Sequence, residues 1–87
     1  MSINYISSHN FVKKWSKLND KTKKKSVLKI NLFLDNPYQP VLKTHKLTGK
    51  LKDYWAFSIE YNLRIMFRFV NNKTVEFIDI GTHSIYR

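Results

Sequence analysis

The residues Gly81-Thr82-His83-Ser84-Ile85-Tyr86-Arg87 bring an imidazole, a phenol and a guanidinium together directly after a hydrophobic strand pattern. Such groups can cut RNA without a metal ion, because RNA supplies its own nucleophile in the 2′-hydroxyl. The protein must then supply a base, an acid for the leaving oxygen and positive charge for the crowded phosphate. His83 is the first candidate for proton transfer, since imidazole changes its protonation near neutral pH.

Three further residues are candidates for the same chemistry. Arg64 can act as the phosphate ligand, because a guanidinium stays charged and binds two oxygens at once. Tyr86 can donate to phosphate, stack on a base or act as a weak acid, and His45 can complete the site. The alternative for all of them is an ordinary surface or packing role. The basic residues expected to bind the RNA backbone are Lys43, Lys46, Lys50, Lys52, Arg68 and Arg87.

The charge balance limits the classes of partner. The chain has 16 Lys and Arg against 6 Asp and Glu, a net charge of +10, which favours nucleic acid, an anionic membrane or an acidic protein. No apolar run approaches the roughly 18–20 residues of a membrane span, and no signal segment opens the chain. We therefore expect a cytoplasmic protein without a membrane partner. Without cysteine, and with three isolated histidines, we expect no metal site and no cofactor.

The 87 residues are too few for two cores, so 1–87 is expected to be a single domain. The patterns predict an α+β fold with a short N-terminal strand, a helical hairpin and a three-stranded antiparallel meander, with the helices on one face of the sheet. Ser7 or Ser8 can cap the first helix and Asn19-Asp20 the second, which ends at about Asp35. The basic first half of this second helix should be solvated and its apolar second half packed. Residues 36–53 read as a basic loop.

The strands follow from a change in period from 3.6 to 2 after this loop. Large aromatic residues then occupy alternate positions, which predicts that they face the helices as core rather than stack on bases. The residues expected in this core are Trp15, Trp55, Phe57, Phe67 and Phe69.

The hydrophobic faces also predict the strand register. A three-residue turn at Glu60-Tyr61-Asn62, with Asn62 in the left-handed region, pairs Ser58 with Arg64. In the next hairpin, facing the core residues pairs Arg68 with Glu76, an opposite-charge pair.

This second hairpin also sets Arg64 opposite Ile80, so that Arg64 lies near His83 on the face away from the helices. A two-residue turn at 71–72 is the competing register, and it would place a carboxylate opposite Phe67 in the core.

Four segments in this order resemble the RelE/ParE toxin superfamily over nearly the whole chain. They are His45–Leu51, Trp55 on a strand, Leu63–Phe67 and the closing Ile80–Tyr86. The resemblance implies a toxin that cleaves mRNA on the ribosome and is held inactive by a cognate antitoxin. An acidic, amphipathic antitoxin segment could wrap a domain of such positive charge and fold on binding.

The details mix two branches of the superfamily. His45 before Leu-x-Gly, and the Gly-x-His-Ser ending, look like the YafQ branch, whereas Arg64 looks like RelE. Ser58 and Asn62 stand where the YafQ-type pattern has His and Asp, so that either Arg64 and the lysine loop compensate or activity is reduced. The competing hypotheses are a ParE-like gyrase inhibitor, an RNA-binding module without catalysis, and an inactive relative that binds an antitoxin.

Overall fold

Two polar residues define where the helices begin. Ser8 precedes α1 (His9–Ser16), and its Oγ accepts a hydrogen bond of 3.0 Å from an amide of the first turn. Asn19 precedes α2 (Asp20–Asp35), and its Oδ1 accepts one of 2.8 Å in the same way. Each side chain satisfies an amide that the start of a helix leaves without a backbone partner. Both caps, and the end of α2 two residues before Pro37, confirm the prediction.

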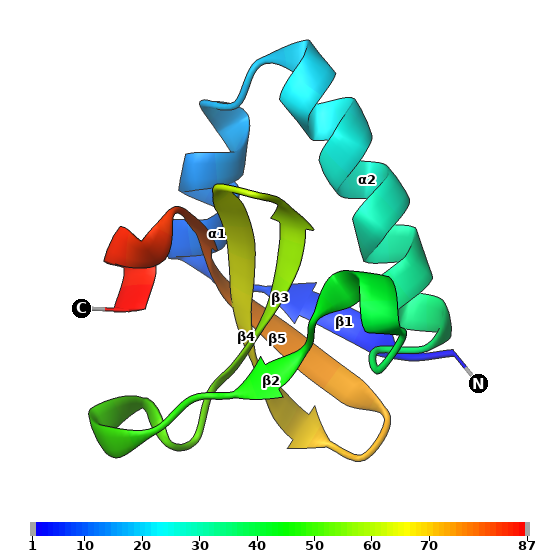
Figure 1. Cartoon of the computed structure of the whole chain (residues 1–87), viewed down its shortest axis with the longest axis vertical. Coiled ribbons are helices and arrows are strands. Elements are labelled where there is room, and N and C mark those ends of the chain that lie inside the picture. The colour runs from blue at the N-terminus through cyan, green and yellow to red at the C-terminus, as the bar shows by residue number, and fades with distance from the viewer. Residues whose placement is uncertain (1, 87) are drawn as a thin grey trace.

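The computed structural model describes residues 2–86, and within them five strands form one sheet (Figure 1). The sheet order is β1-β5-β4-β3-β2; β1 pairs in parallel with β5, and the other neighbours are antiparallel. The predicted α+β class is confirmed. The strands are β1 (Asn4–Ser7), β2 (His45–Lys46), β3 (Trp55–Glu60), β4 (Leu63–Asn71) and β5 (Thr74–Gly81), and the 3-10 helices are η1 (Pro40–Leu42), η2 (Gly49–Leu51) and η3 (His83–Tyr86).

Two of these strands add edges to the predicted meander. The segment expected to be only a loop contains β2, where His45 pairs with Ala56 and Lys46 with Trp55. At the other edge, β1 joins β5, a connection that the sequence left open. A two-residue strand shows no periodicity of its own, so β2 could not be found from the pattern.

The turn between β3 and β4 differs from the prediction. Ser58 pairs with Arg64 as expected, but Glu60 pairs with Leu63 after a bulge, which leaves a two-residue turn. Asn62 does not adopt the left-handed conformation, and Lys43 is the one non-glycine residue of positive φ among residues 2–86. The bulge places the extra residue within β3, and neither residue of the remaining turn, Tyr61 or Asn62, has a positive φ.

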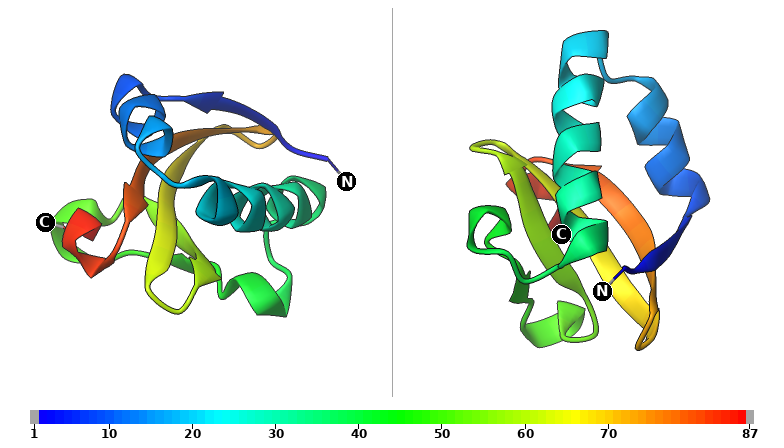
Figure 2. Two further views of the ribbon diagram at one scale, coloured as in Figure 1. Left: turned by 90° about the horizontal axis from the view of Figure 1, so that it is seen from above. Right: turned by 90° about the vertical axis from the view of Figure 1, so that its right-hand side faces the viewer.

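Helix α2 lies over one face of the sheet (Figure 2), and aromatic rings fill the space between the two. The ring of Phe33 in α2 stacks on Phe57 with centroids 4.2 Å apart and meets Phe67 edge-on at 4.7 Å. Trp55 and Phe69 pack against this core while partly exposed. The aromatic face of the meander is therefore core, as predicted, and the alternate residues, Ser58 and Arg64 among them, lie on the opposite face.

The apolar half of α2 is only partly packed, which corrects the prediction. Phe33 is fully buried, but Val27 is 45%, Leu28 66% and Leu32 38% exposed. Between α1 and α2 runs a groove of about 300 Å³, here called the helix groove. It is lined by Tyr5, Ser7, Phe11, Val12, Trp15, Val27, Ile30, Asn31, Leu34 and Phe77.

Neither α1 nor α2 has the length and hydropathy that a membrane crossing requires.

Candidate active site

The ladder of β3, β4 and β5 places Arg64 between Ser58 and Gly81. Ser58 and Arg64 alternate with buried residues of the core, so their side chains leave the sheet on the face away from α2. Two residues after Gly81 the chain enters η3, which begins at His83 and lies beside β4 and β5. The structure thus brings Arg64 next to the C-terminal segment, as the sequence predicted.

The exact partner of Arg64 differs from the prediction. Arg64 lies opposite Gly81 rather than Ile80, because Ile78 is an extra, bulged residue of β5. A regular ladder would have put Asp79 in the core and Ile80 on the outer face. The bulge instead keeps Ile80 buried and releases the Asp79 carboxylate to Lys14 of α1, at 2.7 Å. The buried apolar positions Phe77 and Ile80 are three residues apart instead of two. This break in the alternation was a signal in the sequence for the bulge.

A close contact at Gly81 holds η3 against the strand end. A Cβ on Gly81 would lie 2.8 Å from Cγ2 of Ile85, whose side chain is buried. The Oγ1 of Thr82 lies 3.1 Å from the hydroxyl of Ser84 and stabilises the turn. Glycine is therefore required here for space, since any larger residue would push Ile85 and η3 away.

Within η3 the two candidate rings contact each other. The centroids of His83 and Tyr86 are 5.7 Å apart, and the rings meet edge to face at 86°. His83 is exposed, whereas Tyr86 is half-buried. The imidazole is thus accessible to a ligand while the phenol is held by its surroundings.

Two polar atoms of the predicted site are buried without a hydrogen-bond partner in the described part of the chain. They are Nε of Arg64 and Oη of Tyr86. A buried polar group left unsatisfied costs about 1–3 kcal/mol, and buried polar atoms are usually paired, so each such atom calls for an explanation. A bound anion that accepts hydrogen bonds would satisfy both a guanidinium and a phenol.

The register places His45 on the same outer face. His45 pairs with Ala56, which pairs in turn with Met66, one row along the sheet from Arg64. Its Nδ1 lies 3.0 Å from the carbonyl oxygen of Lys43. Because a carbonyl only accepts, Nδ1 donates in this contact, and Nε2 of the neutral ring keeps its lone pair.

The predicted RNA-binding residues divide into groups. Lys43, Lys50 and Lys52 are exposed on the segment from η1 to η2. Lys46 is exposed too, but it pairs with Trp55 and so leaves the opposite face from His45. Arg68 donates from Nε to Oε1 of Glu76 at 2.8 Å, so a carboxylate already offsets its charge. The prediction for Arg87 falls outside the described residues.

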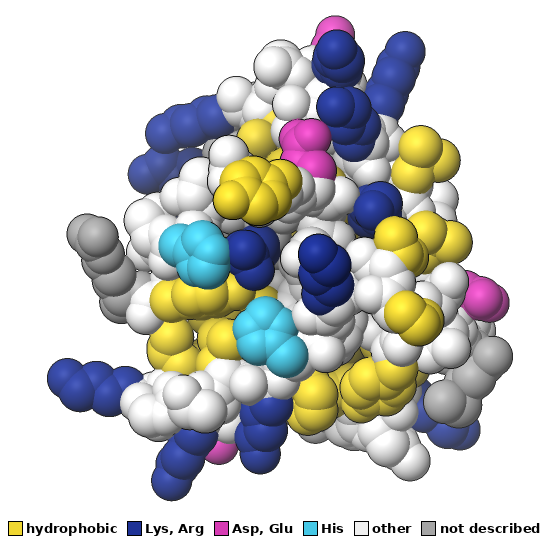
Figure 3. Space-filling model, in the orientation of Figure 1, with side chains coloured by type: hydrophobic (Ala, Val, Ile, Leu, Met, Phe, Trp, Pro, Cys, Tyr) yellow, Lys and Arg dark blue, Asp and Glu magenta, His cyan; other side chains and the backbone are white. Residues whose placement is uncertain are grey.

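Figure 3 shows how charge is distributed on this side of the molecule. Two histidine side chains lie on this face with Lys and Arg side chains near them, and apolar side chains are exposed between. Carboxylates are few and lie mainly toward the edges of the view. Among residues 2–86 no group of three or more His, Cys, Asp or Glu side chains could hold a metal ion. The face is therefore suited to an anionic ligand with apolar or aromatic parts.

Comparison with solved structures relates this geometry to known proteins. YafQ from E. coli is 22% identical, with 97% of each chain covered and a TM-score of 0.78. A YoeB/ParE toxin from Agrobacterium tumefaciens is 18% identical over 93% of this chain and 99% of its own, with a TM-score of 0.76. The chain has the fold of the RelE/ParE toxin superfamily. The E. coli DinJ-YafQ toxin-antitoxin complex contains a chain 21% identical to this one, at a TM-score of 0.76 and coverage of 98% and 97%.

No protein-family model and no curated protein sequence matches the chain, so the likeness to RelE/ParE toxins rests on the fold. Ser58 and Asn62, which depart from the YafQ-type pattern, lie in different surroundings. Ser58 is a direct neighbour of Arg64 on the outer face, whereas Asn62 is exposed in the β3–β4 turn.

Proposed function

We propose that this chain is the toxin of a type II toxin-antitoxin system and a metal-independent endoribonuclease that cleaves mRNA on the ribosome. The observation that carries the proposal concerns two buried atoms, Nε of Arg64 and Oη of Tyr86, which have no hydrogen-bond partner within residues 2–86, together with the exposed ring of His83 beside Tyr86. A scissile phosphate would accept hydrogen bonds from the guanidinium and the phenol. The cost of leaving these atoms unsatisfied in the free protein would then be recovered on binding RNA.

The reaction needs two proton transfers around one phosphorus. A base removes the 2′-hydroxyl proton, the oxygen attacks the adjacent phosphorus in line, and the bond to the 5′-oxygen breaks. An acid protonates the departing 5′-oxygen, which leaves a 2′,3′-cyclic phosphate and a 5′-hydroxyl. Nε2 of His45 is suited to be the base, because Nδ1 is engaged by a carbonyl, and His83 then serves as the acid. Arg64 and Tyr86 stabilise the charge that builds on the phosphate oxygens.

The exposed lysines extend this site along the RNA backbone. Lys43, Lys50 and Lys52 lie on the same segment as His45, so they contact phosphates beyond the cleaved one. Such contacts carry no sequence information but supply affinity that falls with salt.

Cleavage of message in a translating extract tests the proposal. With the wild-type protein we expect new mRNA ends that carry a 5′-hydroxyl, and with His83→Gln we expect the message to remain intact. His9→Gln is the matched control, because His9 is an exposed residue at the start of α1. Intact message with the wild-type protein, or cleavage by His83→Gln at the wild-type rate, would refute the nuclease. Inhibition of gyrase supercoiling by the purified protein would instead favour the ParE-like hypothesis.

We further propose that the cognate antitoxin binds the helix groove with an acidic, amphipathic segment. The groove is mostly apolar, and Tyr5, Val12 and Val27 on its walls are 52%, 54% and 45% exposed. Lys24 is exposed on α2 one turn before Val27 of the groove wall, and the chain as a whole carries a net charge of +10. An apolar stripe flanked by carboxylates would match this surface in shape and charge. The antitoxin of the DinJ-YafQ complex gives this partner a precedent on the same fold.

A further inference from the structure

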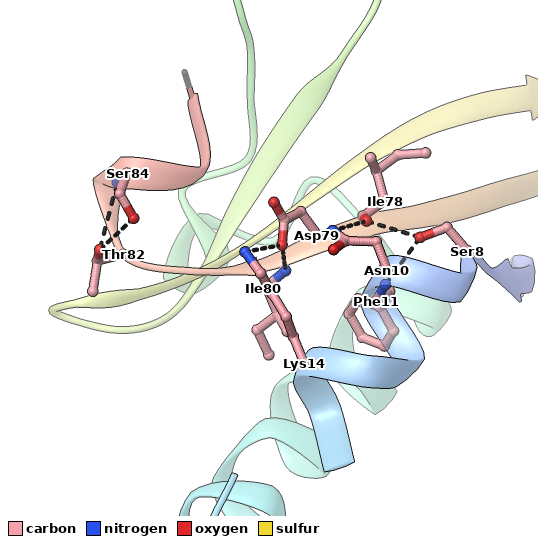
Figure 4. Close-up of polar contacts among 9 residues, drawn as sticks. All are labelled: Ser8, Asn10, Phe11, Lys14, Ile78, Asp79, Ile80, Thr82 and Ser84. Carbon is pink, nitrogen blue, oxygen red and sulfur yellow. Dashed lines mark hydrogen bonds and ion pairs between the residues drawn. The ribbon is translucent and has the colours of Figure 1, made fainter. Parts of the chain in front are cut away.

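The bulge in β5 is fixed from outside the sheet by the first turns of α1 (Figure 4). Because the bulge adds Ile78, this residue has no partner in β4. Its carbonyl oxygen accepts a hydrogen bond of 2.8 Å from Oγ of Ser8 and one of 3.3 Å from Nδ2 of Asn10. The amide of Ser8 also donates to the carbonyl of Phe77 at 2.9 Å. Ser8 therefore supplies hydrogen-bond donors to two successive carbonyl oxygens of β5, those of Phe77 and Ile78, at the bulge.

The hydroxyl of Ser8 does two things at once. It accepts from the amide of Phe11, which caps α1, and it donates to Ile78, which satisfies the bulge. A hydroxyl can do both because it has one donor and two acceptor positions. A carboxylate could replace it as a helix cap but could not donate to a carbonyl. The two roles of Ser8 are thus separable by substitution.

An ion pair fixes the next residue of the bulge to the same helix. Nζ of Lys14 lies 2.7 Å from Oδ1 of Asp79, and this oxygen accepts from the amide of Ile80 at 2.8 Å. The Asp79 side chain is only 13% exposed, so the contact is partly shielded from water. From Asp79 it is one residue to Ile80 and one more to Gly81, which faces Arg64.

We propose that Ser8 is a positioning residue for the nuclease site, which acts through the β5 bulge and touches no RNA. Burial of Ile80 sets which register is adopted, and Ser8 holds the end of β5 in it. Gly81, His83 and Tyr86 then keep a constant position relative to Arg64. This inference rests on the proposed nuclease function for its catalytic consequence, but its structural part can be measured without RNA.

The test compares Ser8→Asp with Ser8→Thr in the full chain, by amide hydrogen exchange and by cleavage kinetics. Ser8→Thr keeps both roles of the hydroxyl, so exchange at residues 78–82 and kcat should stay within about twofold of wild type. Ser8→Asp keeps the cap but loses the donor. Its amides at 78–82 should exchange about tenfold faster, and kcat should fall by about 100-fold at unchanged KM, because the site is displaced while the lysine contacts remain.

A second variant guards against a general loss of folding. Lys14→Met removes the contact to Asp79 at a partly exposed position and should likewise speed exchange at 78–82 and lower kcat, by about three- to tenfold. Exchange at the β3–β4 hairpin should not change in any variant. Wild-type exchange and kcat in Ser8→Asp would overturn the proposal, as would faster exchange with wild-type kcat or a changed KM alone. If the wild-type protein cleaves no RNA, the nuclease and the catalytic consequence fall together, while the exchange result still decides whether Ser8 holds the strand.

Discussion

Arg64 lies directly opposite Gly81 in the β4–β5 ladder. This pairing places Arg64 beside the start of the segment that carries the rings of His83 and Tyr86. Gly81 is also the residue against which Ile85 packs, so one position fixes both the partner of Arg64 and the path of η3. The bulge at Ile78 makes this possible, because it moves glycine rather than isoleucine into the position opposite Arg64.

Substitution of Gly81 should therefore damage the site more than the fold. In Gly81→Ala the new Cβ would meet Cγ2 of Ile85 at 2.8 Å, so η3 must shift and carry His83 and Tyr86 with it. We expect cleavage to fall by about 100-fold, with a loss of unfolding free energy of about 1–3 kcal/mol from overpacking. RNA cleavage rates and urea denaturation of the same preparation measure the two effects.

Gly49→Ala is the matched control for this variant. Gly49 has φ of 65° with nothing within 4 Å of a Cβ, so alanine there is strained but not crowded. It should cost about 1–2 kcal/mol and change cleavage far less than Gly81→Ala. Equal loss of cleavage in both variants would mean that stability, not the position of η3, controls activity.

Part of this arrangement could be predicted from the sequence because hydrophobic alternation fixes which residues share a face. Ser58 opposite Arg64 and Arg68 opposite Glu76 both follow from burying the aromatic positions, and both are confirmed. The same alternation gave Ile80 as the partner of Arg64, which is wrong. A strict period of two has no place for a bulged residue, although the sequence Phe77-Ile78-Asp79-Ile80 breaks that period.

Other features depend on contacts between distant residues and could not be predicted. The hydrogen bond from Ser8 to Ile78 joins residues 70 positions apart. Nothing in the type of either residue indicates that the two are in contact. The half-exposed apolar face of α2 is a similar case, because helical periodicity identifies an apolar stripe but not what covers it. The grouping of His45 with Arg64 required β2, which is too short to show a pattern.

Removal of the Arg64 guanidinium should separate stability from activity. Its Nε is buried and has no hydrogen-bond partner among the residues that the structure describes, so Arg64→Met removes an unsatisfied group while keeping an apolar stem of similar length. We expect the unfolding free energy to rise by about 1 kcal/mol, and cleavage to fall by about 100-fold. Thermal and chemical denaturation beside a cleavage assay would measure both. A destabilised Arg64→Met would show that the guanidinium has a structural partner.

Loss of the Tyr86 hydroxyl should act in the same direction but more weakly. Tyr86→Phe keeps the ring that meets His83 edge to face and removes a buried hydroxyl that lacks a partner in the described part of the chain. Stability should be equal or higher by up to about 1 kcal/mol, with cleavage reduced by about tenfold. Tyr61→Phe is the control, since Tyr61 is 90% exposed in the β3–β4 turn and should change neither quantity.

The salt dependence of RNA binding should distinguish free from paired cations. Lys50 and Lys52 are exposed, whereas Arg68 is paired with Glu76 at 2.8 Å. Each lysine replaced by methionine should lower the slope of log affinity against log salt by about 0.7–0.9, uniformly across RNA sequences. Arg68→Met should change the slope much less and cost under about 1 kcal/mol of stability. A larger effect on the slope from Arg68→Met than from the lysines would restore Arg68 as an RNA ligand.

A charge placed in the helix groove should weaken antitoxin binding without touching the nuclease site. In Val27→Glu a carboxylate would replace an exposed apolar side chain on the groove wall, and it would repel an acidic partner segment. We expect the antitoxin to bind at least about tenfold more weakly, while free Val27→Glu cleaves mRNA as the wild type does. Calorimetric titration with the antitoxin measures the first effect, and the extract assay measures the second.

Val70→Glu is the control for this charge change, because Val70 is 43% exposed in β4 and lies outside the groove lining. It adds the same negative charge to the protein, so any general loss of attraction to an acidic partner appears in both variants. A selective loss of binding in Val27→Glu would assign the antitoxin to the groove. Equal binding of both variants would mean that the antitoxin is held elsewhere, because a carboxylate buried under an apolar segment cannot be neutral in its effect.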